Sequence, residues 1–436
     1  MRWADAGPAL AERLDREDPL ARFRARFHIP EGPQGGKLLY FCGHSLGLQP
    51  VDARAAVESA LDEWARFGVE GHFRGERPWI GWGRELAELT APLVGAEPSE
   101  VVLMNGLTVN LHLLLVSFYR PGPRRRLVFV ERHAFSSDLY ALRSHLRLHG
   151  VDPGEAIRHL PADAHGVLAD PGEVEALFRE QGEGAALLLL GGVNYYTGEA
   201  YPVERIVRAA HAAGCPVLVD AAHAAGNIPL SLHAWGVDGA VWCSYKYLNG
   251  GPGSPGGCFI HSRHAGRVGF PRLEGWWGNR EETRFAMDPD FDPAPGAAGW
   301  QISNPPVLSF APLGASLRIF REAGMEHLRA KSILLTGYLE FLLRSMGTDR
   351  FRIITPGDPS SRGAQLSLLF PRGGREAAEA LRKEGVVCDW RAPGVLRLAP
   401  APLYNTFSEA HRCAALLARI LGVGGPSAPV ALTPRV

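Results

Sequence analysis

Lysine is scarce in this sequence. Only four of the 46 basic residues are lysine, and the rest are arginine. The four are Lys37, Lys246, Lys331 and Lys383. Lys246 stands in the stretch CSYKYLNGGPG (243–253), between two tyrosines and just before a glycine-rich turn. Because arginine serves wherever this chain needs a plain surface charge, a lysine at such a position requires a chemical reason.

An excess of charge of either sign is also absent. The chain has 46 Lys+Arg and 46 Asp+Glu residues, a formal net charge of zero and a pI of about 7.3. A protein that binds nucleic acid or an acidic membrane surface is expected to gather positive charge. We therefore expect no nucleic-acid partner.

Long hydrophobic runs are missing as well. The longest, residues 185–190, has the length of a strand, whereas a membrane-spanning helix needs about 20 apolar residues. The N-terminal stretch MRWADAGPALAERLDRED (1–18) is charged and amphipathic, without the apolar core of a signal peptide. We expect a cytoplasmic protein with no membrane partner.

Cysteine is sparse and follows no motif. There is no CxxC and no spacing with histidine that indicates a metal site. In an intracellular chain of this length, such residues are expected to be reduced and mostly buried thiols. The six are Cys42, Cys215, Cys243, Cys258, Cys388 and Cys413.

Short apolar runs alternate with helical patterns through the middle of the chain. Strands that are apolar throughout and separated by helices predict a mainly parallel sheet covered on both faces, an α/β domain. The predicted strands are VVLM (101–104), LVFVE (127–131), ALLLLGGV (186–193), PVLVD (216–220), GAVWCS (239–244) and GCFI (257–260). The predicted helices lie near 108–118, 137–149, 172–181 and 203–213.

The rest of the chain predicts a second, smaller unit. Residues 262–311 are rich in Gly, Pro, Trp and Asp and have no clear period, which is typical of a functional or interfacial loop. A long helix over about 311–346 and a small α+β domain follow. We divide the chain into an N-terminal segment (1–69) packed on the small domain, a large domain (70–310), the small domain (311–423) and a flexible tail (424–436).

Two strand ends carry polar residues. Asp220 closes the predicted strand 216–220, and Lys246 follows the predicted strand 239–244. In open α/β sheets, ligands bind at the carboxyl ends of strands, so this acid and this amine are expected to face one cavity.

Pyridoxal phosphate requires such a pair. A lysine amine forms a Schiff base with its aldehyde, and an aspartate pairs with its ring nitrogen. Arginine forms no such imine, because guanidinium is effectively never deprotonated. A solvated turn lysine remains the alternative for Lys246, and a helix N-cap the alternative for Asp220. The strand-end position and the scarcity of lysine favour the cofactor.

A phosphate site should accompany the cofactor. In MNGLTVNLHLLL (104–115) a strand turns at Gly106 into an apolar helix, so the N–H groups of Leu107 and Thr108 and the Thr108 hydroxyl fit a phosphate. A capped helix with no ligand fits this segment equally well. Phe135 could stack on the pyridine ring, although a lone phenylalanine also fits the core.

These segments resemble those of kynureninase, a fold type I pyridoxal-phosphate enzyme, from about residue 38 to 422. The resemblance lies in the colinear set YFCGHSLGLQP, MNGLTVNLHLLL, AFSSDLYAL, VNYYTG, DAAHAAGN, WGVDGAVWCSYKYLNGGPGSPGGCFIH, GWWG, ISNPP, KSILLTGYLE, RGAQLSL, GVVCD and APAPLYN. It implies a large domain with a mainly parallel seven-stranded sheet and a small α+β C-terminal domain. It also implies hydrolysis of L-kynurenine or 3-hydroxy-L-kynurenine to anthranilate or 3-hydroxyanthranilate and L-alanine, in tryptophan degradation or NAD biosynthesis.

The resemblance also implies roles for residues around the cofactor. Lys246 would be the Schiff-base lysine and the base for the α-proton, with Tyr245 a phosphate ligand and proton carrier. Asp220 would pair with the ring nitrogen and Phe135 would stack on the ring. The further implied cofactor contacts are Leu107, Thr108, Asp138 and His223, with Trp276 and Asn304 from the neighbouring subunit of a homodimer whose active site lies at the interface.

On the substrate side, the resemblance implies that Arg397 binds the α-carboxylate. His72 and the pair Ser303-Asn304 would flank the aromatic ring, as in members that prefer 3-hydroxykynurenine. Ser45 is a further implied contact. Two positions depart from the family pattern: His44 stands where asparagine is common, and Gly191 where relatives often carry serine.

Three other functions are compatible with the Lys246 and Asp220 pair. An aminotransferase of the same fold would use both residues. A cysteine desulfurase would need a nucleophilic cysteine on a loop well after the lysine, but no cysteine lies between Cys258 and Cys388. A cofactor-free regulatory relative is the third, since fold does not fix function.

Overall fold

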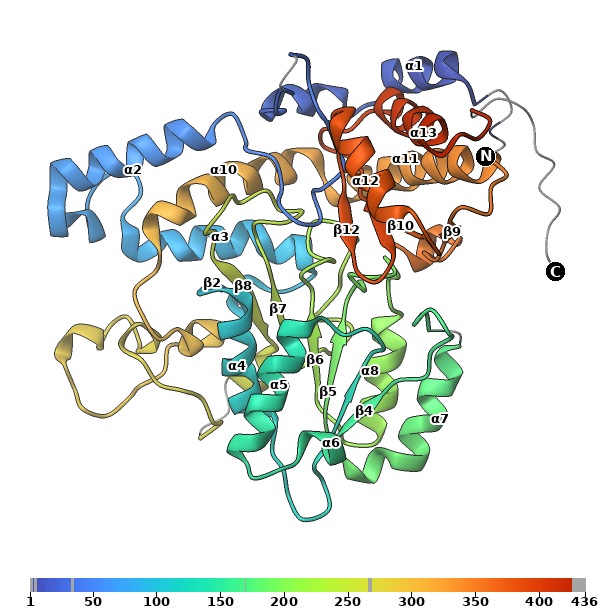
Figure 1. The fold of residues 1–436 in the computed structure, drawn as a ribbon. Coiled ribbons are helices and arrows are strands. Elements are labelled where there is room, and N and C mark those ends of the chain that lie inside the picture. The colour runs from blue at the N-terminus through green and yellow to red at the C-terminus, as the bar shows by residue number, and fades with distance from the viewer. Residues whose placement is uncertain (1–2, 4–5, 33–34, 169, 266–268, 426–436) are drawn as a thin grey trace.

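The computed structural model describes residues 3, 6–32, 35–168, 170–265 and 269–425. A seven-stranded sheet lies between layers of helices, and a four-stranded sheet with its own helices stands above one end of it (Figure 1). The predicted tail from residue 424 falls almost entirely outside the described residues.

The large sheet has the strand order β2-β8-β7-β6-β5-β3-β4. All its strands run parallel except β8, which is antiparallel to both of its neighbours. The mainly parallel sheet is therefore confirmed, and β4 is a strand that the apolar pattern did not predict. The strands are β2 (Val101–Met104), β3 (Leu127–Val130), β4 (Ile157–His159), β5 (Ala185–Gly191), β6 (Val217–Asp220), β7 (Gly239–Trp242) and β8 (Gly256–Ile260).

Both faces of this sheet are buried. Successive side chains of a strand point to opposite faces, and in β5 Leu188 belongs to one hydrophobic cluster while Leu189 belongs to another. Helices α4 and α5 cover the Leu189 face, and α3, α7, α8 and α10 contribute to the cluster on the other. Their bounds are α3 (Trp79–Val94), α4 (Leu107–Phe118), α5 (Ser136–Leu148), α7 (Pro171–Gln181) and α8 (Val203–Ala212), and the one-turn α6 (Pro153–Ala156) precedes β4.

The segment after β8 is irregular, as predicted. Among the described residues between 262 and 306 the regular elements are short helical turns, and the segment extends as a loop beside α3 and α4 (Figure 1). The turns are α9 (Ser262–Ala265), η5 (Trp276–Gly278), η6 (Arg284–Ala286) and η7 (Gly296–Trp300).

The long helix predicted over about 311–346 is wrong in two respects. The helical region begins earlier, at Val307, and it is broken into α10 (Val307–Ala323) and α11 (Met325–Ser345). The break is Gly324, whose φ of 75° and ψ of 132° lie outside the helical region and suit glycine. α10 packs on α2 and α3, whereas α11 packs on α13.

The C-terminal unit is a small α+β assembly. Its antiparallel sheet has the order β12-β13-β10-β9, and a separate two-stranded parallel sheet joins β1 to β11. The strands are β1 (Leu39–Tyr40), β9 (Arg352–Ile353), β10 (Leu366–Leu369), β11 (Val386–Val387), β12 (Asp389–Arg391) and β13 (Val395–Leu398), and the helices are η8 (Pro359–Ser361), α12 (Gly374–Lys383) and α13 (Phe407–Leu421).

The N-terminal segment contacts both units. α1 (Pro8–Arg16) packs on α13, and α2 (Ala53–Phe67) packs along α10 (Figure 1). Two 3-10 turns, η1 (Ala21–Arg26) and η2 (Gly68–His72), flank this region, and η3 (Pro98–Glu100) and η4 (Gly182–Gly184) precede β2 and β5. The domain boundaries at residues 70, 311 and 424 stay predictions.

Two simpler expectations can be compared with the structure. All six cysteines are free and buried, as predicted. Across the described ranges, no helix has both the length and the apolar character needed to cross a bilayer.

Candidate active site

The parallel strands end at one edge of the large sheet. Asp220 is the last residue of β6, and Lys246 lies four residues beyond Trp242, where β7 ends. Strands β6 and β7 are paired neighbours in register, with Asp220 opposite Val241. The structure therefore places the acid and the amine at adjacent strand ends.

An aromatic ring lies close to the lysine. The Nζ atom of Lys246 is 5.8 Å from the centre of the Phe135 ring. Phe135 has extended backbone and immediately precedes α5, which leaves its ring 37% exposed instead of in the core. Its edge contacts the ring of Tyr195, with 5.1 Å between the ring centres.

Three carboxyl groups gather behind this position. Asp138, in the first turn of α5, is buried and shares a hydrogen bond with Asp220. Burial raises the pKa of Asp138 well above its ordinary value, and the charges of Asp220 and Glu131 add to this, whereas Lys246 acts in the opposite direction. These surroundings favour the protonated form of Asp138.

Two helix N-termini meet beside these residues. α4 begins at Leu107 directly after Gly106, and α5 begins at Ser136. The hydroxyls of Thr108 and Ser137 are 2.8 Å apart, which holds the two first turns together. The free N–H groups and positive dipole ends of two helices at one point favour a phosphate.

Glycine keeps the α4 terminus open. A Cβ atom on Gly256 would lie 3.2 Å from the backbone nitrogen of Leu107. A larger residue there would crowd the N–H groups at the start of α4.

Two buried histidines lie near the lysine. His223 and His44 have ring centres 6.0 Å apart, and among the described residues neither His44 nitrogen nor the His223 Nδ1 has a hydrogen-bond partner. Burial lowers the pKa of both rings well below the ordinary value, and the charges of Lys246 and Arg397 contribute. Both imidazoles are therefore neutral. Tyr247 is buried beside His223.

Tyr245 precedes the lysine and is half-buried. The Cys243 thiol donates to its hydroxyl at 3.3 Å. Burial raises the pKa of Tyr245, and the neighbouring Cys243 and Asp220 add to the effect. The phenol therefore keeps its proton and acts as a donor at neutral pH.

Arg397 is buried in β13 at the junction of the two units. One of its NH groups donates to the Tyr195 carbonyl at 2.7 Å, and the other pairs with Asp389, its cross-strand neighbour. Arg391 Nε lies 3.1 Å from the same Asp389 oxygen, and His44 Nε2 lies 3.6 Å from it. Two arginines thus share one carboxylate, which leaves this pocket one negative charge short.

A second group of predicted residues lies elsewhere. His72 packs against Trp79, with 5.1 Å between ring centres, and Trp276 donates from Nε1 to the Arg284 carbonyl. Ser303 and Asn304 are exposed. Within the described part of the chain, no hydrogen bond or ring contact joins these four side chains to Lys246, Asp220 or Arg397.

Ser45 is placed but not paired with the pocket. Its backbone nitrogen donates to the Cys42 carbonyl, in the turn next to His44. Its side chain is half-exposed.

Gly191, where relatives often carry serine, lies next to the Glu131 side chain. A Cβ atom on Gly191 would lie 3.0 Å from Glu131 Oε1, and the Gly191 N–H donates to the Glu131 carboxyl group. The Glu131 side chain therefore fills the space that a serine at residue 191 would enter.

Five residues of this site were not predicted: Ser137, Glu131, Tyr195, Asp389 and Arg391. A signal existed for two of them, because Ser137 stands in a Ser-Ser-Asp helix start and Glu131 is a charge that ends an apolar strand. No local signal marks Tyr195, Asp389 or Arg391.

Sequence comparisons with known proteins agree on one family. The chain is 53% identical over 409 residues to a kynureninase of Koribacter versatilis, covering 94% of this chain and 96% of that protein. The chain belongs to the kynureninase family. It is 51% identical to the kynureninase of Myxococcus xanthus over 93% of this chain and 95% of that protein. A profile of the kynureninase C-terminal domain matches residues 328–417.

Solved structures support the fold. An apo cysteine desulfurase from Thermococcus onnurineus superposes with a TM-score of 0.74 at 16% identity, covering 94% of this chain and 98% of that one. A cysteine desulfurase from Escherichia coli gives 0.74 at 20% identity, over 92% and 98% of the two chains. The fold of this kynureninase family member is thus that of fold type I pyridoxal-phosphate enzymes.

The residues at the sheet edge fit pyridoxal phosphate. They comprise a primary amine on Lys246, a hydrogen-bonded acid pair, the exposed face of Phe135 and two converging helix N-termini. Asp138 Oδ1 and His223 Nδ1 are buried and have no hydrogen-bond partner among the described residues, so both suit contact with a polar group of the cofactor.

Proposed function

We propose that this protein hydrolyses the Cβ–Cγ bond of L-kynurenine and 3-hydroxy-L-kynurenine, giving anthranilate or 3-hydroxyanthranilate and L-alanine in tryptophan degradation or NAD biosynthesis. The observation that carries the proposal is the position of Lys246, 5.8 Å from the Phe135 ring and beside the Asp138–Asp220 pair, in a chain 53% identical to a kynureninase. The protein acts in the cytoplasm.

Pyridoxal phosphate supplies an electron sink for the substrate α-carbon. With the cofactor bound, Lys246 would hold its aldehyde, and the free amine of Lys246 would remove the substrate α-proton. Phe135 would support one face of the ring, and Asp220, hydrogen-bonded to Asp138, would pair with the ring nitrogen. Leu107 and Thr108, with Ser137, would bind the phosphate at the starts of α4 and α5.

The substrate carboxylate completes the charge balance around Arg397. Arg391 and Arg397 share Asp389, and the two nearby histidines are neutral. A carboxylate that binds Arg397 brings the missing negative charge, while Asp389 keeps its contact with Arg391. The planar guanidinium fork suits a carboxylate.

Tyr245 is the proton donor in this proposal. Its raised pKa keeps the phenol protonated, and the Cys243 thiol donates to its oxygen. A donor of this kind next to the lysine can return a proton to the alanine carbon after the bond to the aromatic fragment breaks.

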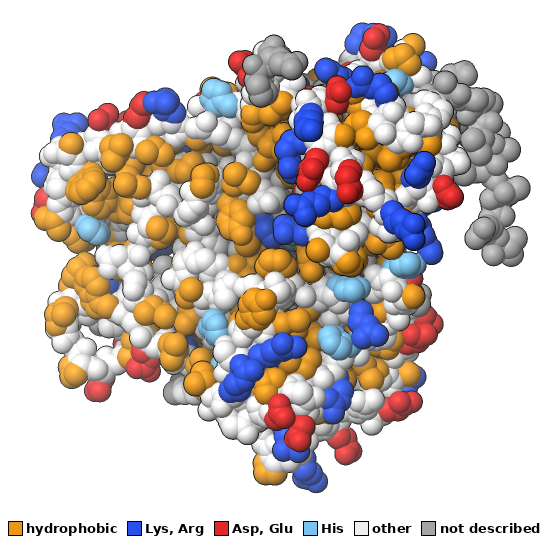
Figure 2. All heavy atoms as spheres, viewed as in Figure 1, with side chains coloured by type: hydrophobic (Ala, Val, Ile, Leu, Met, Phe, Trp, Pro, Cys, Tyr) orange, Lys and Arg blue, Asp and Glu red, His pale blue; other side chains and the backbone are white. Residues whose placement is uncertain are grey.

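A homodimer accounts for the second group of residues. Hydrophobic side chains gather over α2 and the loop after β8 (Figure 2). The exposed side chains there include Trp64 at 59%, Phe73 at 55%, Trp276 at 41% and Phe285 at 53%. Exposed apolar surface of this kind marks an interface. Trp276 and Asn304 then reach the cofactor of the neighbouring subunit, beside substrate contacts from His72, Ser303 and Ser45.

Mixed dimers test the shared site. Lys246→Ala and Asn304→Ala subunits are each expected to be nearly inactive alone. After they are mixed and allowed to exchange, half of the dimers combine one of each and hold one native site, so about a quarter of wild-type activity returns. If mixing restores nothing although exchange is verified by mass, Asn304 does not act across the interface.

Cysteine desulfurase activity is disfavoured by the thiols. All six cysteines are buried, and burial raises the pKa of each thiol. Within the described residues no accessible thiolate is available as a nucleophile.

The function is tested by kcat/KM on kynurenine and 3-hydroxykynurenine, followed by anthranilate fluorescence. Turnover of both is expected, with the 3-hydroxy substrate preferred. A parallel reaction with alanine and a keto acid reports transamination. Transamination without release of an anthranilate would replace the proposal with an aminotransferase.

A further inference from the structure

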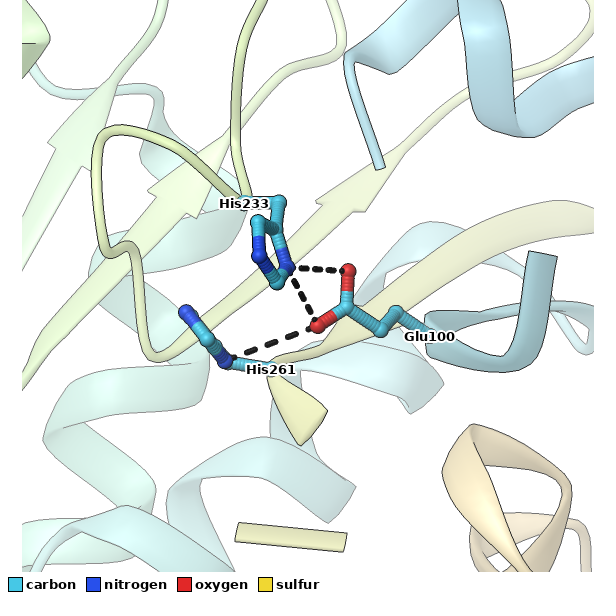
Figure 3. Close-up of side chains that lie close together, drawn as sticks. All are labelled: Glu100, His233 and His261. Carbon is cyan, nitrogen blue, oxygen red and sulfur yellow. Dashed lines mark hydrogen bonds and ion pairs between the residues drawn. The ribbon is translucent and has the colours of Figure 1, made fainter. Parts of the chain in front are cut away.

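Three side chains from distant parts of the chain meet away from the cofactor site. Glu100 ends η3, His233 lies between β6 and β7, and His261 follows β8. Figure 3 shows the three pointing toward one another. Glu100 Oε1 is 2.8 Å from Nδ1 of His233 and 3.5 Å from Nδ1 of His261, and one ligand atom from each residue lies within 4.8 Å of the others.

We propose that Glu100, His233 and His261 bind a divalent transition metal ion of the Zn²⁺, Co²⁺ or Ni²⁺ class. Two imidazole nitrogens and one carboxylate are ligands that these ions prefer, whereas Mg²⁺ and Ca²⁺ prefer oxygen. Two ligands about 2.1 Å from one ion stand roughly 3.0 to 3.4 Å apart in octahedral or tetrahedral geometry. The separations of 2.8 and 3.5 Å between Glu100 and the histidines are close to this range. The ligand atoms of the three residues lie within 4.8 Å of one another, and His261 Nδ1 would exchange the bond that it accepts from the Arg263 N–H at 3.3 Å for the ion.

The carboxylate is already oriented for this role. Its Oε1 accepts the backbone N–H of Ser262 at 2.8 Å, and its Oε2 accepts that of Glu97 at 3.1 Å. Backbone donors of this kind orient metal ligands in known sites and remain in place when the metal binds. The ion would take the place of the hydrogen bond between His233 Nδ1 and Glu100.

An ion has access to the cluster from solvent. The side chain of His233 is 43% exposed, whereas that of Glu100 is 1% exposed. Water can therefore complete the coordination on the His233 side. The cysteines are buried and do not compete for the ion.

The site lies on the opposite edge of the sheet from Lys246. Glu100 precedes the start of β2, and His261 follows the end of the antiparallel β8, whose Ile260 pairs with Gly239 at the start of β7. The bound ion would connect three segments at the amino edge of the parallel strands. We expect it to stabilise the fold without taking part in the reaction.

The test is metal binding to chelator-treated holoenzyme, followed by elemental analysis after dialysis against Zn²⁺ and by thermal unfolding. The wild type is expected to retain one ion per chain more than His233→Asn and to gain several degrees in Tm with Zn²⁺ but not Mg²⁺. His233→Asn keeps a hydrogen-bond donor for Glu100 and removes a good ligand. His28→Ala, at an exposed histidine, is the control and should behave as wild type.

Equal Zn²⁺ retention by wild type and His233→Asn would overturn the proposal, as would an unchanged Tm of the wild type in saturating Zn²⁺. The cluster would then be a hydrogen-bonded structural group. His261→Ala is a second variant that should also lose the ion. If it fails to fold, the result with His233→Asn still decides, because the His233 side chain is 43% exposed.

Discussion

The Nζ atom of Lys246 lies 5.8 Å from the centre of the Phe135 ring. One residue follows a central strand and the other precedes a helix more than a hundred residues earlier. The acid pair Asp138–Asp220 and the starts of α4 and α5 adjoin the same point. The fold thus brings together an amine, an aromatic ring, a pair of acids and two helix N-termini where the strands end.

The first prediction concerns the two hydroxyls that meet between α4 and α5. Thr108→Ala and Ser137→Ala should each raise the Kd for pyridoxal phosphate about 10- to 100-fold, because a hydrogen bond to a charged group contributes about 1.5 to 3 kcal/mol. Cofactor fluorescence titration of the apoprotein measures this. Ser144→Ala, at an exposed position of α5, should leave the Kd unchanged. An equal effect of Ser144→Ala would refute a direct role of Thr108 and Ser137 in binding the cofactor.

The second prediction concerns the carboxylate pocket. Arg397→Gln should raise KM for kynurenine about 30- to 1000-fold, since it removes roughly 2 to 4 kcal/mol of charge-assisted hydrogen bonding. Arg391→Gln should raise KM less than about 10-fold, because its side chain is 42% exposed and contacts Asp389 instead of the substrate. Steady-state kinetics separates the two. Similar KM values for both variants would contradict the assignment of Arg397.

The third prediction is a pH dependence of stability. Burial raises the pKa of Glu131 to about 7 from an ordinary value of 4.5. Between these two values the unfolded chain has released this proton and the native chain has not, so the native state loses stability as the pH rises. Above pH 7 the loss is about 3 kcal/mol.

Glu131→Gln removes this dependence. The variant apoprotein should be more stable than wild type at pH 8 in urea unfolding, and the difference should shrink toward zero near pH 4.5. Glu155→Gln, at an exposed glutamate, should show no such trend. A stability difference between Glu131→Gln and wild type that is the same at all pH values would mean that Glu131 is ionised throughout.

The fourth prediction concerns a buried ion pair between the N-terminal segment and α11. Lys331 Nζ lies 2.7 Å from Asp18, and the two side chains are only 6% and 5% exposed. Asp18→Asn should reduce the free energy of unfolding by about 3 to 5 kcal/mol, because it leaves a buried charge unpaired. The double variant Asp18→Leu, Lys331→Met should lose less free energy of unfolding than either single variant.

An exposed pair supplies the control for that experiment. Glu58→Gln breaks the contact with Arg54, whose side chain is 81% exposed, and should change the free energy of unfolding by less than about 0.5 kcal/mol. If the Asp18 and Lys331 single changes simply add in the double variant, the two residues are not coupled.

Local patterns predicted the candidate residues that stand at the ends of strands and the starts of helices. Asp220 and Lys246 were identifiable because both follow apolar strands, and Leu107 and Thr108 because a glycine turn leads into an apolar helix. The core strands were equally visible, since a sheet buried on both faces needs continuous apolar runs.

Contacts between residues that are far apart in the chain could not be predicted from local sequence patterns. The Thr108–Ser137 contact joins two helix starts, and Ser137 alone resembles an ordinary helix start. The two-residue strands β1 and β11 pair across more than 300 residues and have no period of their own. Gly324 interrupts a pattern that otherwise continues as one helix, and only its backbone angles reveal the break.

The second group of site residues is a different case. His72, Trp276, Ser303 and Asn304 entered only through the family resemblance, because no local feature marks them as functional. In the described part of the chain no hydrogen bond or ring contact joins them to Lys246, and the proposed sharing of the site between subunits cannot be predicted from local patterns in one sequence.

The most direct test of the account is anthranilate release from kynurenine by the cofactor-loaded protein and its Lys246→Ala and Lys246→Arg variants. We predict that the wild type releases anthranilate and an equal amount of alanine. Both variants should lose about 1000-fold or more in kcat, because neither side chain forms the imine. No anthranilate from the wild type, or wild-type rates from either variant, would contradict the account.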